Sequence, residues 1–267
     1  MAKFTCNFIS YTLRRTVDIT VIIPSVTIPE SMGMTLPKGE KARHQKPGKY
    51  PVLYLLHGMG NNHAQWTGYT NVELFAEERN IAVVMLSAEN KSYVNMYGDR
   101  FFDFVSEELP DFVKEMFPVS DRPEDTYIAG LSMGGFGTLV HAFSHPERFA
   151  AMGAFSAAVQ LNPYSLAGDD EANKHPIDPE YDPLSLAKKC VADGKKVPQI
   201  YVACGENDFL YEANKEFVKQ LEALGLKPTV DFVPGYAHEW RFWNLEVEKF
   251  LDWIVRSDDF AGSRRQV

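Results

Sequence analysis

Cysteine is scarce in this chain of 267 residues, and its three cysteines are scattered, at Cys6, Cys190 and Cys204. An odd number without a C-x-x-C spacing argues against a disulfide framework and against a zinc site. Such usage fits a reducing compartment. The N-terminal segment also lacks the apolar core of a signal peptide. These features predict a cytoplasmic protein.

The chain also lacks long apolar runs and an excess of positive charge. No stretch approaches the roughly 18 apolar residues that a membrane span needs. The net charge is −9 without a block of like charges, which argues against nucleic-acid and anionic-membrane partners. Internal repeats and low-complexity segments are missing as well. We therefore expect a soluble globular protein.

Apolar runs of strand length alternate with helix-like segments along most of the chain. An alternating apolar and polar pattern predicts an antiparallel strand pair over 3–11 and 16–23. Short, nearly continuous apolar runs predict strands buried on both faces at 52–56, 81–86, 127–131, 149–155, 199–204 and 229–233. Helical spacing of apolar residues predicts helices over 71–79, 103–117, 135–144, 184–192, 211–224 and 239–255. The alternation predicts an α/β fold, with a mostly parallel eight-stranded sheet covered by helices on both faces.

This pattern predicts a single domain over residues 1–256. Residues 24–50 are rich in proline, glycine and lysine and are expected to form a long exposed connection. The irregular segment 157–198 lies between two predicted strands. Two predictions for it have nearly equal support: a cap over the active site, and an ordinary surface excursion. Residues 257–267 are polar and are predicted to form a flexible tail.

A serine flanked by glycines, Gly130-Leu-Ser132-Met-Gly134, lies between a predicted strand and a predicted helix. This is the strand–turn–helix context of a nucleophile elbow. The turn is so tight that a Cβ at either glycine would collide with neighbouring backbone, while strain at the serine raises its hydroxyl above the sheet edge. The alternative is a glycine-rich turn with an incidental serine.

Titratable side chains follow two later strands, where parallel sheets place their chemistry. Asp208 follows 199–204 and His238 follows 229–233, so the order is Ser…Asp…His, as in α/β-hydrolases. We predict Ser132 as nucleophile, His238 as general base and then acid, and Asp208 as the carboxylate that orients the imidazole. Glu206 and, more weakly, Asp182 are alternatives to Asp208.

The fourth element is His57-Gly58-Met59-Gly60, which follows the predicted strand 52–56. In this position the fold supplies one oxyanion donor, while the residue after the nucleophile supplies the other. We predict the backbone N–H groups of Met59 and Met133 as these donors, with His57 as a structural residue that hydrogen-bonds within its loop. A plain glycine-rich turn is the alternative.

Four motifs together resemble the esterase D family, and within it the bacterial tributyrin esterases and feruloyl (cinnamoyl) esterases: residues 55–66, 130–137, 205–210 and 235–240. The similarity extends from about residue 5 to residue 255, and the family's triad falls on Ser132, Asp208 and His238. The resemblance implies an α/β-hydrolase fold, no metal or organic cofactor, and activity on short acyl or small aromatic esters. Some relatives form oligomers, so a homo-oligomer is an open expectation. The family also contains S-formylglutathione hydrolases and acyltransferases.

Aromatic residues gather in the loops at the predicted active end. We expect a pocket for an apolar acyl group or a phenolic ring, bound by Trp66, Tyr97, Phe209, Tyr236 and Trp240. Taken singly, each of them is more often a core residue. The leading prediction is a serine carboxylesterase that acts on a small-molecule ester through an acyl-enzyme. The alternatives are a thioesterase for S-formylglutathione, an acyltransferase, and a catalytically silent binding protein.

Overall fold

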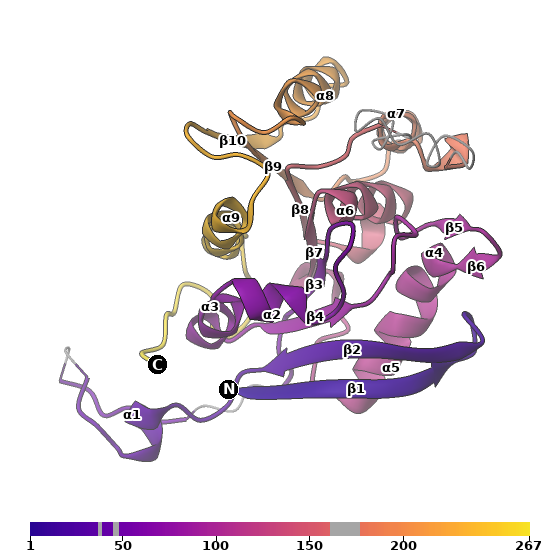
Figure 1. Ribbon diagram of the computed structural model, residues 1–267. Helices are drawn as coiled ribbons and strands as arrows, with labels where there is room; N and C mark the ends of the chain where they lie inside the picture. The colour runs from indigo at the N-terminus through magenta and orange to yellow at the C-terminus, as the bar shows by residue number, and fades with distance from the viewer. Residues whose placement is uncertain (37–38, 45–47, 161–176) are drawn as a thin grey trace.

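An eight-stranded sheet forms the centre of the protein (Figure 1). This computed structural model describes residues 1–36, 39–44, 48–160 and 177–267. In the described chain the strand order is β1-β2-β4-β3-β7-β8-β9-β10. The strands are β1 (Ala2–Ser10), β2 (Arg15–Ile23), β3 (Val52–Leu56), β4 (Ala82–Leu86), β7 (Thr126–Leu131), β8 (Ala151–Phe155), β9 (Gln199–Gly205) and β10 (Thr229–Val233).

The pairing of these strands is parallel from β4 to β10, and β1 and β2 add an antiparallel pair at one edge. Parallel pairing brings the carboxyl ends of β3, β7, β9 and β10 to the same edge of the sheet. The prediction of an α/β-hydrolase fold with an antiparallel N-terminal pair is confirmed.

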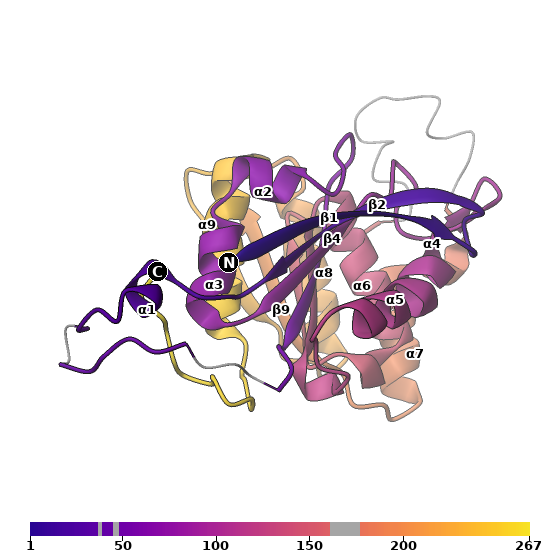
Figure 2. The same ribbon diagram turned by 90° about the horizontal axis from the view of Figure 1, so that it is seen from below.

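Each central strand is buried on both faces because helices cover the sheet from both sides (Figures 1 and 2). On β3, Leu53 and Leu55 belong to one apolar cluster, while Val52, Tyr54 and Leu56 belong to the other. One face packs against α3 (Val72–Arg79) and α9 (Trp240–Trp253). The other packs against α5 (Leu109–Met116), α6 (Met133–Ser144), α7 (Pro183–Ala192) and α8 (Tyr211–Ala223). This explains why these strands are almost continuously apolar.

The single helix predicted over 103–117 is divided into three parts. They are α4 (Phe101–Asp103), a π-helical turn over Phe104–Glu108, and α5. Pro110 has no N–H and would clash with the carbonyl four residues earlier in a regular α-helix. That carbonyl, on Ser106, instead accepts a hydrogen bond from the Arg148 guanidinium. A proline inside an apolar periodic pattern thus changes the helix type without ending the helical segment.

Short elements fill segments that the sequence pattern leaves as loops. The connection 24–50 contains α1 (Ile28–Ser31), which begins with a capping box between Thr27 and Glu30. Another short helix, α2 (Gln65–Tyr69), follows β3, and β5 (Asn95–Met96) pairs with β6 (Asp99–Arg100). Elements this short lack enough residues to show a period of apolar side chains.

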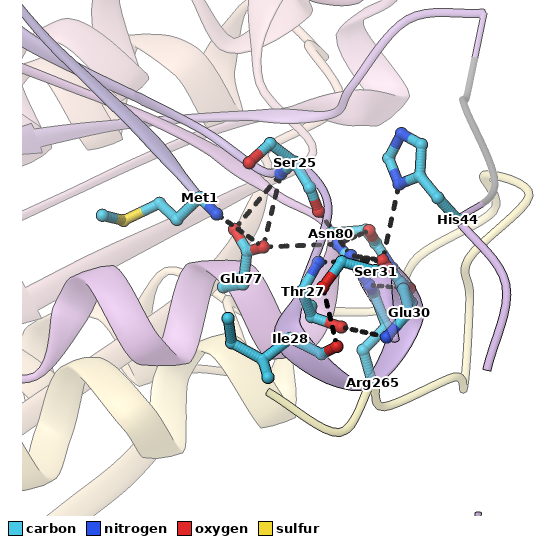
Figure 3. Close-up of polar contacts among 10 residues, drawn as sticks. All are labelled: Met1, Ser25, Thr27, Ile28, Glu30, Ser31, His44, Glu77, Asn80 and Arg265. Carbon is cyan, nitrogen blue, oxygen red and sulfur yellow. Dashed lines mark hydrogen bonds and ion pairs between the residues drawn. The ribbon is translucent and has the colours of Figure 1, made fainter. Parts of the chain in front are cut away.

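The C-terminal tail, predicted to be flexible, contacts the body of the protein through Arg265 (Figure 3). The Arg265 guanidinium binds both carboxylate oxygens of Glu30, at 3.1 and 2.7 Å, and the side-chain oxygen of Asn80 at 2.7 Å. It also lies 3.8 Å from the buried carboxylate of Glu77. The tail therefore joins α1 to α3 through ion pairs that only the folded chain brings together.

The segment 157–198, predicted to form either a cap or a surface excursion, is described only in part. Residues 161–176 lie outside the described residues. Before them, Ala157, Ala158 and Val159 are buried, and after them α7 begins at Pro183. Among the described residues, no helix has the length and apolar character required to cross a membrane.

Candidate active site

Ser132 occupies a sharp turn between β7 and α6. Its backbone has φ 53° and ψ −114°, in a region that side-chain-bearing residues rarely adopt. A Cβ on Gly130 would lie 2.5 Å from the backbone of Gly134, and one on Gly134 would overlap the carbonyl oxygen of Leu56. The two glycines are therefore required by close backbone contacts. The turn holds the Ser132 side chain at the carboxyl end of the sheet.

The structure brings Ser132, His238 and Asp208 into one hydrogen-bonded array. His238 Nε2 lies 3.0 Å from Ser132 Oγ, and its Nδ1 lies 2.8 Å from Asp208 Oδ2. An ionised carboxylate can only accept, so Nδ1–H donates to Asp208 and leaves Nε2 free to accept the serine proton. Asp208 is 5% exposed, and its other oxygen accepts the N–H of Leu210 at 2.8 Å. Both carboxylate oxygens are thus fixed in place.

Glu206 and Asp182, the two alternatives to Asp208 as the carboxylate that orients His238, lie elsewhere. Glu206 is exposed, and its backbone N–H donates to the Val233 carbonyl at 3.0 Å, which ties the loop after β9 to the end of β10. Asp182 caps the first turn of α7 by accepting the N–H of Ser185 at 2.8 Å. Of the three candidates, the structure places only Asp208 against His238.

The two backbone segments predicted to carry the oxyanion donors both lie next to Ser132. One is residues 57–60, called here the oxyanion loop, and the other is the N-terminus of α6, which begins at Met133. The first N–H groups of a helix have no partner within the helix, so the Met133 N–H is available to a ligand. The oxyanion loop approaches closely, since a Cβ on Gly58 would lie 3.5 Å from Ser132 Cβ.

His57 is buried at the start of the oxyanion loop. Its Nε2 accepts the N–H of Ala88 at 2.9 Å, and its Nδ1 lies 2.7 Å from the carbonyl of Gly58. Burial lowers the pKa of His57 to about 4, so the ring is neutral and Nδ1–H donates to Gly58. These contacts support the predicted structural role of this histidine.

A cavity of about 480 Å³ opens beside the array and is bordered mainly by apolar side chains. Two of the predicted pocket residues, Phe209 and Trp240, line it. Phe209 is 64% exposed, and its ring centroid lies 4.7 Å from that of His238. The described lining is Gly58, Met59, Asn61, Leu131, Ser132, Met133, Ala158, Phe209, Leu210, His238, Glu239, Trp240 and Trp243.

The other three predicted pocket residues are not among the described residues that line this cavity. Trp66 is fully buried, and its indole N–H donates to the carbonyl of Leu56 at 3.0 Å. Tyr97 lies in the β5–β6 hairpin, with the ammonium of Lys91 4.9 Å from its ring centroid. The ring of Tyr236 packs against Phe242. Trp66 and Tyr236 thus pack against other parts of the fold, and Tyr97 projects from the hairpin.

Sequence reasoning missed Trp243 as a cavity residue. Its indole ring meets the His238 ring nearly at right angles, with centroids 4.9 Å apart, and its N–H donates to Ser156 Oγ at 3.2 Å. Trp243 is three residues after Trp240, so the two side chains share one face of α9. That spacing is the available signal, because Trp240 is itself predicted at the active end.

The sheet topology, the strained serine turn and the hydrogen-bonded array define a serine hydrolase of the α/β-hydrolase class. The model of the Esterase family matches residues 31–253. The chain therefore belongs to this family and hydrolyses carboxylic esters.

Individual relatives cover nearly the whole chain. An acetyl esterase of Caldicellulosiruptor saccharolyticus is 27% identical over 97% of this chain and 100% of its own. The Staphylococcus aureus fluorophosphonate-binding serine hydrolase FphF, solved with substrate bound, is 29% identical, with a TM-score of 0.83 over 96% of this chain and 99% of its own. An S-formylglutathione hydrolase of Staphylococcus aureus is 28% identical, with a TM-score of 0.77 over 95% and 96%. These relatives confirm the resemblance drawn from the motifs.

Proposed function

We propose that this protein is a serine carboxylesterase that cleaves short-chain acyl or small aromatic, hydroxycinnamoyl-type esters through an acyl-enzyme. The observation that carries the proposal is the unbroken chain of hydrogen bonds from Ser132 through His238 to Asp208. A serine hydroxyl is a poor nucleophile until a neighbouring imidazole accepts its proton, and the carboxylate stabilises the resulting imidazolium.

In the first half-reaction, Ser132 Oγ attacks the ester carbonyl carbon while its proton passes to His238 Nε2. The carbonyl oxygen becomes an oxyanion, which accepts hydrogen bonds from the N–H groups of Met59 and Met133. When the intermediate collapses, the C–O bond to the alcohol breaks and His238 returns the proton to the departing alkoxide. The alcohol leaves, and the acyl group remains esterified to Ser132.

In the second half-reaction, water takes the place of the alcohol. His238 removes one proton from the water as its oxygen attacks the acyl carbon, and the same two N–H groups stabilise the second oxyanion. Collapse breaks the bond to Ser132 Oγ, which recovers its proton from His238. The carboxylic acid leaves, and the enzyme regains its starting state.

The substrate class is inferred from the cavity lining. The rings of Phe209, Trp240 and Trp243 offer an apolar surface next to Ser132, and the volume of about 480 Å³ is within the range of sites that bind a whole small molecule. One relative is named an acetyl esterase, which agrees with a short acyl chain. Another is named an S-formylglutathione hydrolase, so thioester hydrolysis by the same three residues is the second candidate.

A substrate panel tests the proposal. Wild type and Ser132→Ala are assayed on p-nitrophenyl acetate, butyrate and octanoate, on methyl ferulate and on S-formylglutathione. We expect activity on acetate and butyrate, and a loss of about 10⁶ in kcat for Ser132→Ala. Higher kcat/KM on S-formylglutathione than on every oxygen ester would favour the thioesterase. A folded wild type that is inactive on the whole panel would refute the proposal.

A further inference from the structure

The loop that follows β4, residues 87–94, lies behind the oxyanion loop and contains unusual backbone geometry. Glu89, Ser92 and Tyr93 have φ values of 50°, 52° and 63°, in the left-handed region that favours glycine. A residue in this region is strained and persists only where surrounding contacts hold it. Tyr93 is nonetheless fully buried. Strain at the buried Ser92 and Tyr93 calls for a structural or functional reason.

Three hydrogen bonds join this loop to the oxyanion loop. The Tyr93 hydroxyl donates to the carbonyl of His57 at 2.8 Å, and the Ala88 N–H donates to the His57 ring at 2.9 Å. The side-chain oxygen of Asn90 accepts the N–H of Gly60 at 2.8 Å. These bonds fall on both sides of Met59. The backbone that carries the Met59 N–H is therefore held at two points from outside the cavity.

Tyr93 also contacts α6, the helix that supplies the second N–H group. Its ring lies against Gly137, where an added Cβ would come within 2.6 Å of the ring. Its carbonyl is 2.9 Å from Nε2 of the buried His141. Burial lowers the pKa of His141 to about 4, so this imidazole is neutral, and its Nε2–H donates to Tyr93.

We propose that Tyr93 is a positioning residue that fixes the separation between the two oxyanion donors. One end of its side chain holds the loop that carries Met59, and the other end packs on the helix that begins at Met133. Tyr93 is not among the described residues that line the cavity, so it acts through those two elements and not on the substrate. The inference rests on the proposed esterase function.

The test compares Tyr93→Phe with a matched control, Tyr127→Phe. Tyr127 is also fully buried, and its hydroxyl also donates to a backbone carbonyl, that of Glu124, at 3.2 Å. Each variant loses one hydroxyl and keeps its ring. For Tyr93→Phe we expect kcat on p-nitrophenyl acetate to fall about tenfold with little change in KM, because the oxyanion forms only after binding. The control keeps the wild-type kcat.

Inhibitor binding separates positioning from general damage. Phenylboronic acid forms a tetrahedral adduct with the active serine and places an oxygen where the oxyanion would lie, whereas butyrate binds without forming one. We expect Tyr93→Phe to raise the inhibition constant of phenylboronic acid about tenfold, in step with the loss of kcat/KM, and to leave that of butyrate unchanged. Equal effects on both inhibitors would overturn the inference.

A second variant keeps the inference open to refutation if Tyr93→Phe does not fold. Asn90→Ala removes the acceptor of the Gly60 N–H from an exposed position, and we expect kcat to fall about threefold with KM unchanged. Wild-type kinetics in both Tyr93→Phe and Asn90→Ala, or in the one that folds, would overturn the inference. An inactive wild type would instead refute the esterase proposal.

Discussion

Glu246 provides a measurable link between pH and the stability of α9, the helix that follows His238. Its carboxylate is fully buried against β9, where it accepts the Tyr201 hydroxyl at 2.8 Å and contacts the Lys249 ammonium at 3.1 Å. Asp231 Oδ2 lies 3.2 Å from the oxygen of the same hydroxyl and accepts a hydrogen bond from the same ammonium at 2.6 Å. Burial, helped by the nearby charge of Asp231, raises the pKa of Glu246 from 4.5 to about 7, although Tyr201 and Lys249 act to lower it.

The sign and size of the effect follow from this shift. Between about pH 4.5 and 7 the folded protein keeps a proton that the unfolded chain has released. The stabilisation is therefore complete below pH 4.5 and is lost as the pH rises through 7. One pKa unit corresponds to about 1.4 kcal/mol, so the difference between the folded and unfolded pKa of Glu246 lowers the free energy of unfolding by about 3 kcal/mol in total. Most of this loss falls between pH 5 and 8.

Glu246→Gln removes this titration and keeps an acceptor for Tyr201. Wild type and variant are unfolded in urea at pH 5, 6, 7 and 8, and the free energy of unfolding is extrapolated to water. We expect the variant to gain about 2 to 3 kcal/mol relative to wild type between pH 5 and 8. Glu222→Gln, which neutralises an exposed carboxylate on α8, is the control and should follow the wild-type pH dependence.

The refuting result is a constant difference between Glu246→Gln and wild type over this pH range. It would mean that Glu246 is ionised in the folded protein at pH 5, so that Lys249 and Tyr201 compensate fully for its burial. If the variant instead loses stability relative to wild type as the pH rises, folding lowers the pKa of Glu246 and does not raise it.

Asp208→Asn should lower kcat about 10⁴-fold by disturbing the tautomer of the catalytic imidazole, whereas Glu206→Gln should keep near wild-type kcat. Comparable losses in both variants, measured on p-nitrophenyl acetate, would contradict the assignment of Asp208. Arg265→Ala should lower the free energy of unfolding by about 3 kcal/mol, because Glu30 and Glu77 lose a largely buried guanidinium. An unchanged Tm in Arg265→Ala would show that the docked tail adds no stability.

Much of the sheet could be predicted from the sequence because strands buried on both faces are continuous apolar runs, as in 52–56 and 127–131. The antiparallel edge is visible from its alternation. Elements of two to five residues, such as β5 and α1, escape prediction since they are shorter than the period that reveals them. The apolar spacing predicts one helix across Pro110, yet the missing N–H of this proline produces a π-helical turn.

The tail shows a different limit. Residues 257–267 have no apolar pattern, so the sequence predicts flexibility, but Arg265 pairs with Glu30 from the other end of the chain. An ion pair between residues so far apart leaves no local signature. The same limit applies to Tyr93, whose contacts with His57 and Gly137 arise only when the loop after β4 packs against α6.

The sequence by itself determined which residues are candidates for the catalytic array, because chain order and position after a strand constrain which serine, carboxylate and histidine can meet. Tight turns demand glycine, so Gly130 and Gly134 predict a nucleophile elbow at Ser132 once Asp208 and His238 follow later strands in the expected order. Only the tertiary structure decided between Asp208 and Glu206, and only it placed Trp243 in the cavity wall and Trp66 in the core. Trp66 and Trp243 are the same residue type, so the sequence does not distinguish a core position from a cavity wall. Which of the two each side chain occupies depends on the parts of the chain that pack against it.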